Sequence, residues 1–274
     1  MSVVRAPETR SKDARPNAEV AGGPSERVRG LRRAPAREAW SQLAAPLRKG
    51  QGIRVLFFGI TQYGKSTSVR DFLAYLESEK LTDLTVIHDV KMKRPQFEGE
   101  IIHEADHIPA NPPERYPATR VLRRRDVNHV PSVEAAAKFC FEQAWDGCRT
   151  LLVVDEMRWA LTESGDSFDA PHVRRIYCEG GGLGSSIIAT KQLPQHTPSE
   201  AIGQSKIVFH RQADKVLKFL VRQGTIDERD AEVISSLDVG EFVALDAEDN
   251  FDGTVYVTPP PARRAAPEEE EPPP

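Results

Sequence analysis

The stretch Gly59-Ile60-Thr61-Gln62-Tyr63-Gly64-Lys65-Ser66 decides the fold, because it fits the P-loop pattern G-x4-G-K-[ST]. The apolar run 53–58 directly before it predicts a buried strand, and residues 65–79 after it predict a helix with one apolar face. A glycine-rich loop between a strand and a helix N-terminus points several backbone N–H groups at an anion. The stretch therefore predicts a site for the phosphates of a nucleotide.

Within this loop the residue types suggest separate roles. Lys65 is long enough to reach the β- and γ-phosphates, and the Ser66 hydroxyl is a ligand suited to Mg²⁺. We accordingly expect ATP and Mg²⁺ as cofactors. The residues predicted to contact the nucleotide are Gly59, Ile60, Thr61, Gln62, Tyr63, Gly64, Lys65, Ser66 and Thr67.

A second part of the site is predicted at the end of another strand. Residues 150–154 are predicted to form a strand with four apolar residues at 151–154, and Asp155-Glu156 follows it directly. We expect Asp155 to hold Mg²⁺ and Glu156 to act as the general base that polarises the attacking water. A solvated strand end followed by a helix N-cap is the alternative interpretation of this pair.

A third strand, 185–190, ends in polar residues and is expected beside the Asp155 strand. That position would place Thr190 and Gln192 near the γ-phosphate, where Gln192 would sense hydrolysis. Apolar runs alternate with helical patterns from residue 53 to 209, which predicts an α/β fold. We expect a mainly parallel sheet with helices on both faces.

The composition divides the chain into three parts. Residues 1–50 carry 11 Lys or Arg and 5 Asp or Glu, whereas the whole chain carries 37 and 41, so a basic arm precedes an acidic body. We expect residues 1–50 to be a disordered arm with one short helix near 36–45, and 51–258 to be the ATPase domain. Residues 259–274, acidic and rich in proline, are expected to be a disordered tail.

Other classes are disfavoured by composition. The chain has 3 cysteines and no CxxC pair, which excludes a zinc ribbon and fits a reducing compartment. No run approaches the roughly 18 apolar residues that span a membrane, and the N-terminus has no apolar signal segment. We expect the protein in the cytoplasm, or in a virion if it is viral.

The chain resembles the FtsK/HerA superfamily of DNA-translocating ATPases over roughly residues 53–246. The resemblance rests on Gly59 to Ser66, on Asp155-Glu156, and on the run 187–194, and it continues through 198–211. It implies a RecA-like (ASCE) sheet, a homo-oligomer that is usually a hexameric ring, and double-stranded DNA as partner. Small members of the superfamily include genome-packaging ATPases of membrane-containing viruses, and this chain is similar to them in size.

Two departures from the superfamily concern the catalytic arginine. The superfamily usually shows Thr-Gln-Arg-Pro after the sensor strand, and this chain is one residue longer there, at 190–194. The arginine expected just before that strand is replaced by Gly180-Gly181-Gly182. The candidates for the arginine that a neighbouring subunit would supply are therefore Arg174, Arg175 and Arg211. Arg211 is favoured because it follows the last core strand, as in the superfamily. A surface arginine is the alternative for each.

Two further patterns compete for a function. The run His103 to His107 matches HExxH, the zinc hydrolase motif, but the prolines around it argue against the helix that this motif needs. The run Arg123-Arg124-Arg125 would contact DNA phosphates inside a ring, or be a solvated basic run.

Two functions from different classes follow from these residues. The first is an ATP-hydrolysing motor that translocates duplex DNA, with viral or mobile-element genome packaging as its most specific form. The second is a nucleotide-switched ATPase that docks to a capsid, membrane or other assembly partner and does not move DNA. A zinc hydrolase is a third, weaker alternative.

Overall fold

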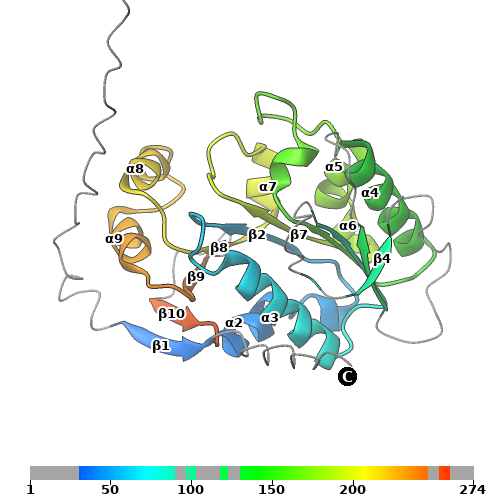
Figure 1. The fold of residues 1–274 in the computed structure, drawn as a ribbon, viewed down its shortest axis with the longest axis horizontal. Helices are drawn as coiled ribbons and strands as arrows, with labels where there is room; N and C mark the ends of the chain where they lie inside the picture. The colour runs from blue at the N-terminus through cyan, green and yellow to red at the C-terminus, as the bar shows by residue number, and fades with distance from the viewer. Residues whose placement is uncertain are drawn as a thin grey trace, which may run out of the picture.

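The computed structural model describes residues 31–89, 97, 99–102, 118–122, 130–245 and 253–259. Over these residues the strands form one sheet in the order β1-β10-β9-β8-β2-β7-β6-β3-β5-β4 (Figure 1). The pairs that join β9 to β8 and to β10 are antiparallel, and the other pairs are parallel. The strands are β1 (Arg32–Pro35), β2 (Arg54–Phe58), β3 (Leu84–His88), β4 (Glu100–Ile102), β5 (Ala118–Leu122), β6 (Thr150–Val154), β7 (Ser185–Lys191), β8 (Lys206–Phe209), β9 (Glu241–Leu245) and β10 (Thr254–Val257).

The order of the central strands determines where the site lies. Strand β7 pairs with β2 on one side, with Phe57 opposite Thr190, and with β6 on the other, with Val154 opposite Ala189. Strands β2, β7 and β6 are parallel, so their carboxyl ends meet at one edge of the sheet. The P-loop after β2 and the acidic pair after β6 therefore flank the end of β7, about 10 Å apart across two strand spacings.

Helices cover both faces of this sheet (Figure 1). One apolar core unites one face of the sheet with α4, α5, α7, α8 and α9, and a second core unites the other face with α2 and α3. The predicted α/β class, with a mainly parallel sheet covered on both faces, is confirmed. The helices are α2 (Ala36–Leu43), α3 (Lys65–Ser78), α4 (Val130–Trp145), α5 (Pro171–Cys178), α6 (Gly180–Leu183), α7 (Ser199–Gln204), α8 (Asp214–Arg222) and α9 (Glu228–Ser236), with 3-10 turns η1 (Leu47–Lys49) and η3 (Met157–Ala160). None of these helices is long and apolar enough to cross a membrane.

The boundary that the sequence predicts at residue 50 is wrong, because residues 31–50 are part of the domain. Strand β1 pairs with β10, and α2 packs on α3 and β10. Trp40 is 1% exposed and stacks between Phe72 and Phe242, with ring centroids 4.9 and 4.8 Å away. Its indole N–H donates to Asp71 at 2.7 Å. A single aromatic residue among charged ones therefore anchors a segment whose composition suggested an arm, while the predicted short helix is present as α2.

Trp40→Ala is expected to lower the free energy of unfolding by about 3–5 kcal/mol, because it empties a fully buried aromatic site. Urea unfolding followed by circular dichroism would measure this change. Trp145, which is 68% exposed at the end of α4, provides the matched control, and Trp145→Ala should change stability by less than about 0.5 kcal/mol. Equal stability of the two variants would show that α2 does not belong to the folded unit.

Two other parts of the chain differ from the sequence prediction. Strands β4 and β5 extend the sheet beyond β3, although the sequence analysis predicts no strand in this part of the chain. Strands β9 and β10 and helices α7 and α9 were not predicted. Short strands and short helices carry few periodic positions, so pattern alone identifies them poorly.

Candidate active site

The P-loop joins β2 to α3, as predicted. Gln62 and Gly64 adopt left-handed conformations, with φ of 72° and 99°, which curl the backbone ahead of the helix. A Cβ atom on Gly59 would lie 2.7 Å from the Cβ of His210, so only glycine allows the loop to approach β8 this closely. The Ile60 N–H donates to the Arg211 carbonyl at 3.0 Å and fixes the loop to the segment after β8.

The Lys65 side chain folds back over the loop. Its ammonium group donates to the carbonyl of Gly59 and, at 3.1 Å, to the carbonyl of Ile60. The charge thus lies inside the curve of the loop, at the N-terminus of α3, where an anion is also favoured by the helix dipole.

His210 packs against the P-loop at Gly59, and the sequence analysis did not identify it as part of the site. It is fully buried, and its ring packs on Phe242. Its backbone N–H donates to the Phe58 carbonyl at 2.8 Å. Burial, and next the nearby charge of Lys65, lower the pKa of His210 to about 3. The imidazole is therefore neutral at physiological pH and adds no charge that would compete with Lys65.

The acidic pair and the sensor strand are linked by one hydroxyl. Thr190 at the end of β7 donates through Oγ1 to Asp155 Oδ1 at 3.2 Å, and the same oxygen accepts from the Glu156 N–H at 3.0 Å. Asp155 is 2% exposed and Thr190 is 3% exposed, so the link is shielded from water. Strand β7 lies beside β6, as the sequence predicts, whereas the position of Thr190 near the γ-phosphate stays a prediction.

Glu156 has a strained backbone, with φ of 71° in the left-handed region. For a residue other than glycine this conformation costs about 1–3 kcal/mol, and such residues concentrate at functional sites. The hydrogen bond from its N–H to Thr190 holds the residue in place. Its side chain is partly exposed and lines a cleft of 440 Å³ together with Arg158, Trp159 and Gln192.

A further carboxylate at this edge was missed. Asp89 directly follows β3 and is 1% exposed, and the neighbouring Asp155 N–H donates to the His88 carbonyl at 3.0 Å. The signal was present in the sequence, since an acidic residue closes an apolar strand just as Asp155 does. It lacks a motif of its own, so only the pairing of β3 with β6 brings it to the site.

Lys191 holds the loop that carries Gln192. Lys191 is 8% exposed, and its ammonium group donates to the carbonyls of Gln195, at 3.2 Å, and His196, and to the Thr197 hydroxyl at 3.1 Å. Gln192 itself is exposed in the cleft, and its carbonyl accepts from Gln212 at 3.4 Å. Lys191 ends β7, and its side chain thus fixes the loop that follows through residues 195–197.

Burial lowers the pKa of Lys191 to about 8, although Glu156 and Asp166 oppose the shift. The unfolded chain therefore binds more protons than the folded chain between about pH 8 and 10, so this residue's contribution to stability rises with pH there. A neutral amine still donates to both carbonyls and accepts from the Thr197 hydroxyl. Relative to Lys191→Met, we expect the wild-type chain to gain about 1–3 kcal/mol across this range in urea unfolding. A pH-independent difference between the two proteins would contradict the prediction.

The candidate arginines lie in different surroundings. The Arg211 guanidinium lies 5.4 Å from the ring centroid of Tyr63, so it covers the P-loop of its own chain. On α5, Arg174 pairs with Glu200 at 3.3 Å and Arg175 pairs with Glu179 at 3.0 Å. Arg158, in the same cleft as Glu156, is an exposed arginine that the sequence analysis did not consider.

The HExxH-like stretch 103–107 and the basic run 123–125 lie outside the described residues, as do the termini 1–30 and 260–274. The residues that are described fit Mg²⁺ together with a nucleotide. Ser66 lies in the first turn of α3, next to Lys65, and Asp155 offers a buried carboxylate across the end of β7. Hydroxyl and carboxylate oxygens are the hard ligands that Mg²⁺ takes alongside phosphates.

Comparison with known proteins gives a fold class. No family model matches the sequence, and no curated protein matches it either. Among solved structures, the genome packaging NTPase B204 from Sulfolobus turreted icosahedral virus 2 in complex with sulfate superposes with a TM-score of 0.60 at 15% identity, covering 76% of this chain and 97% of that one. Its complex with AMPPCP gives a TM-score of 0.58 at 17% identity, covering 76% and 98%.

The DNA-packaging ATPase B204 from Sulfolobus Turreted Icosahedral Virus superposes with a TM-score of 0.57 at 17% identity, covering 76% of this chain and 97% of that one. The chain therefore has the fold of the P-loop packaging ATPases. This agrees with the resemblance found in the sequence, at the level of architecture.

Proposed function

We propose that the chain is an Mg-ATP-hydrolysing motor that translocates duplex DNA as a homo-oligomeric ring, in genome packaging of a virus or mobile element. The observation that carries this proposal is the Thr190 hydroxyl, which ties Asp155 to the Glu156 backbone at the sheet edge that also holds the P-loop. Such an arrangement couples a phosphate cradle to a water-activating carboxylate. The chain would work in the cytoplasm or in association with a virion.

Each side chain has a role in this reaction. Lys65 would neutralise the β- and γ-phosphates, while Asp155 and Ser66 would hold Mg²⁺, which supplies further charge neutralisation when bound. Glu156 would orient and deprotonate the attacking water. Gln192, at the mouth of the cleft, would sense the γ-phosphate, and Arg211 would stabilise the transferred charge, either from its place on the P-loop of its own chain or from a neighbouring subunit.

The choice of DNA rests on two supports. The fold is shared with proteins named as DNA-packaging ATPases, and the sequence resembles the superfamily of DNA translocases through its P-loop, acidic pair and sensor strand. ATPase activity of the full chain should rise severalfold on addition of duplex DNA at low salt. Turnover that ignores duplex DNA would remove the translocation part of the proposal and leave the ATPase part standing.

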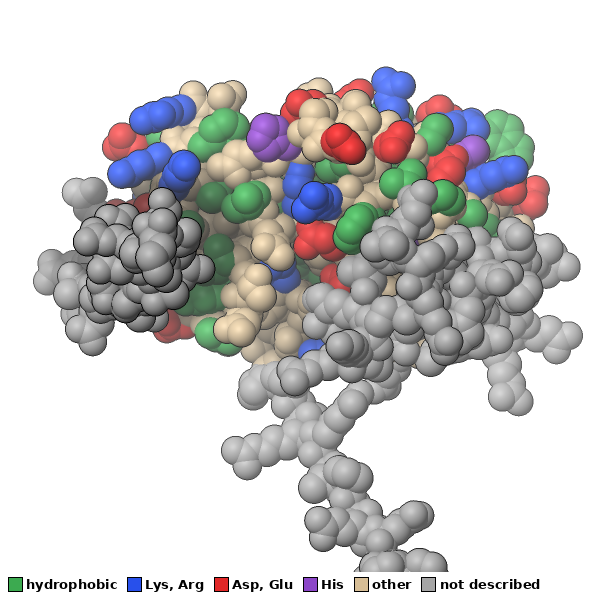
Figure 2. Space-filling view, turned by 45° about the horizontal axis from the view of Figure 1, so that its top comes forward, with side chains coloured by type: hydrophobic (Ala, Val, Ile, Leu, Met, Phe, Trp, Pro, Cys, Tyr) green, Lys and Arg blue, Asp and Glu red, His purple; other side chains and the backbone are tan. Residues whose placement is uncertain are grey.

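A nucleotide-switched docking ATPase is the second candidate, and the surface favours it. On the face seen in Figure 2, Lys and Arg side chains alternate with Asp and Glu over the described residues, rather than forming a basic stripe that would follow DNA phosphates. Arg174 and Arg175, the two candidates for the catalytic arginine on α5, are also paired with glutamates. Sizing with and without an ATP analogue, combined with a DNA-binding assay, separates the candidates, because this one predicts ATP-dependent assembly without DNA affinity.

A further inference from the structure

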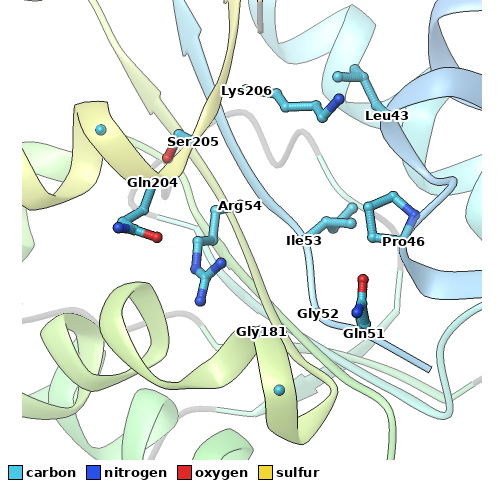
Figure 3. A pocket seen from close by; sticks show the side chains of 12 residues that line it. Leu43, Pro46, Gln51, Gly52, Ile53, Arg54, Gly181, Gln204, Ser205 and Lys206 are labelled. Carbon is cyan, nitrogen blue, oxygen red and sulfur yellow. The ribbon is translucent and has the colours of Figure 1, made fainter. Parts of the chain in front are cut away.

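A second cavity lies at the amino end of β2, whereas the P-loop follows the carboxyl end of this strand. Figure 3 shows the side chains that line the cavity. Its volume is 430 Å³, and it lies between the end of α2 with Pro46, the segment 51–54 at the start of β2, α6, and the segment 203–206 from the end of α7 to the start of β8. Arg54 begins β2 and Phe58 ends it, so the cavity and the P-loop are separated by the length of this strand, about 15 Å. The cavity is therefore distinct from the nucleotide site.

The lining of this cavity is positively charged. It contains Arg54 and Lys206 and no acidic residue, although the whole chain has a net charge of -4. Figure 3 shows the two cations on different walls, with Arg54 directed toward Gly181 and Lys206 directed toward Leu43. The complete lining is Leu43, Pro46, Gln51, Gly52, Ile53, Arg54, Gly181, Gly182, Gly203, Gln204, Ser205 and Lys206.

Arg54 is half-buried, and the described residues give it no carboxylate partner. Its Nε donates to the Ile176 carbonyl at 3.4 Å, a long hydrogen bond that leaves the two terminal nitrogens for the cavity. A Cβ on Gly181 would lie 2.7 Å from Nη2, so this glycine makes room for the guanidinium. Burial lowers the pKa of Arg54, as expected for a desolvated cation that lacks a counter-ion.

Ser205 provides a second, independent observation. It is 1% exposed, it lines the cavity, and its hydroxyl has no hydrogen-bond partner among the described residues. Lys206 lies opposite Val55 in the parallel pair of β2 and β8, so the preceding residue, Ser205, lies beside Arg54. A buried hydroxyl without a partner is costly, and a bound acceptor would relieve that cost.

We propose that this cavity binds a phosphate group through the Arg54 guanidinium and the Ser205 hydroxyl, with Lys206 adding positive potential from the opposite wall. A phosphate offers several acceptor oxygens to donors that lie on different sides, and arginine is the residue best suited to bind them. The phosphate belongs either to a nucleic-acid backbone or to a free phosphate compound. The site is separate from the proposed ATPase centre.

Calorimetric titration of pyrophosphate into the full-length Lys65→Ala chain tests the site, because this variant weakens binding at the P-loop. We expect one remaining site, with affinity lowered about tenfold by Ser205→Ala and about a hundredfold by Arg54→Gln. Lys49→Gln removes an exposed positive charge that is not part of the lining and should change affinity by less than about twofold.

Arg54 also donates to a carbonyl of α5, so its substitution can destabilise the fold. The pyrophosphate affinity of the Arg54→Gln variant is therefore interpreted only if its melting temperature stays close to that of the Lys65→Ala chain. Ser205→Ala removes a hydroxyl without a described partner and keeps the test decisive if Arg54→Gln unfolds. Absence of pyrophosphate binding in Lys65→Ala would overturn the site. Equal affinities of Ser205→Ala and Lys49→Gln would overturn it as well.

A duplex oligonucleotide, added in the same titration, identifies the source of the phosphate. A duplex that displaces pyrophosphate, and that binds Ser205→Ala less tightly, identifies a nucleic-acid backbone. A duplex that leaves pyrophosphate bound identifies a free phosphate compound. ATP turnover of the chain with Lys65 intact is followed in parallel, so a failure of the proposed ATPase activity is distinguished from a failure of this second site.

Discussion

Lys65→Ala should reduce ATP turnover by about a thousandfold, because it removes the one P-loop side chain that brings positive charge to the phosphates. The fold should survive, since the hydrogen bonds that Lys65 donates to the Gly59 and Ile60 carbonyls stay within its own loop. A coupled assay of phosphate release, with circular dichroism as a check of folding, measures both effects.

Lys80→Ala is the control for this substitution. Lys80 is exposed just beyond α3, so its loss changes the net charge equally without touching the loop. Its turnover should match that of the wild-type chain. If Lys65→Ala also hydrolysed ATP at the wild-type rate, the assignment of the nucleotide site to the P-loop would be wrong.

Glu156→Gln should keep ATP bound and slow its hydrolysis by about 10²–10⁴-fold, because the amide has the shape of the carboxylate but cannot accept the proton of the attacking water. The backbone hydrogen bond to Thr190 does not involve the side chain, so the strained conformation is retained. Single-turnover hydrolysis, together with a separate measurement of ATP affinity, distinguishes the chemical step from binding.

Glu163→Gln is the matched control, since Glu163 is an exposed glutamate that lines the same cleft. Its hydrolysis rate and its ATP affinity should both stay near the wild-type values. Rapid hydrolysis by Glu156→Gln would assign the general base to another residue, and the buried Asp89 at the neighbouring strand end would then be the first to test.

Much of this site was predictable from local patterns. The P-loop has a fixed spacing that follows from the geometry of phosphate binding, and Asp155-Glu156 ends an apolar strand that periodicity identifies. The contact of Thr190 with the acidic pair depends on the pairing of β7 with β6, which a local pattern does not dictate. His210, Lys191 and Asp89 were missed because each acquires its role from a neighbour in space, and none belongs to a motif with a recognisable spacing.

The sequence by itself determined the class of fold and identified the P-loop and the acidic pair as the two parts of the candidate nucleotide site. Both are local features, because short-range spacing dictates how a strand, a glycine loop and a helix follow one another. Only the tertiary structure decided where the domain begins, how Lys191 secures the sensor loop, and that Arg54 and Ser205 share a cavity. Trp40 shows the physical reason most clearly. Residues 31–50 are rich in charge, yet they belong to the folded domain because Trp40 packs on residues as distant in the chain as Phe242. A local sequence pattern cannot predict a contact between residues so far apart.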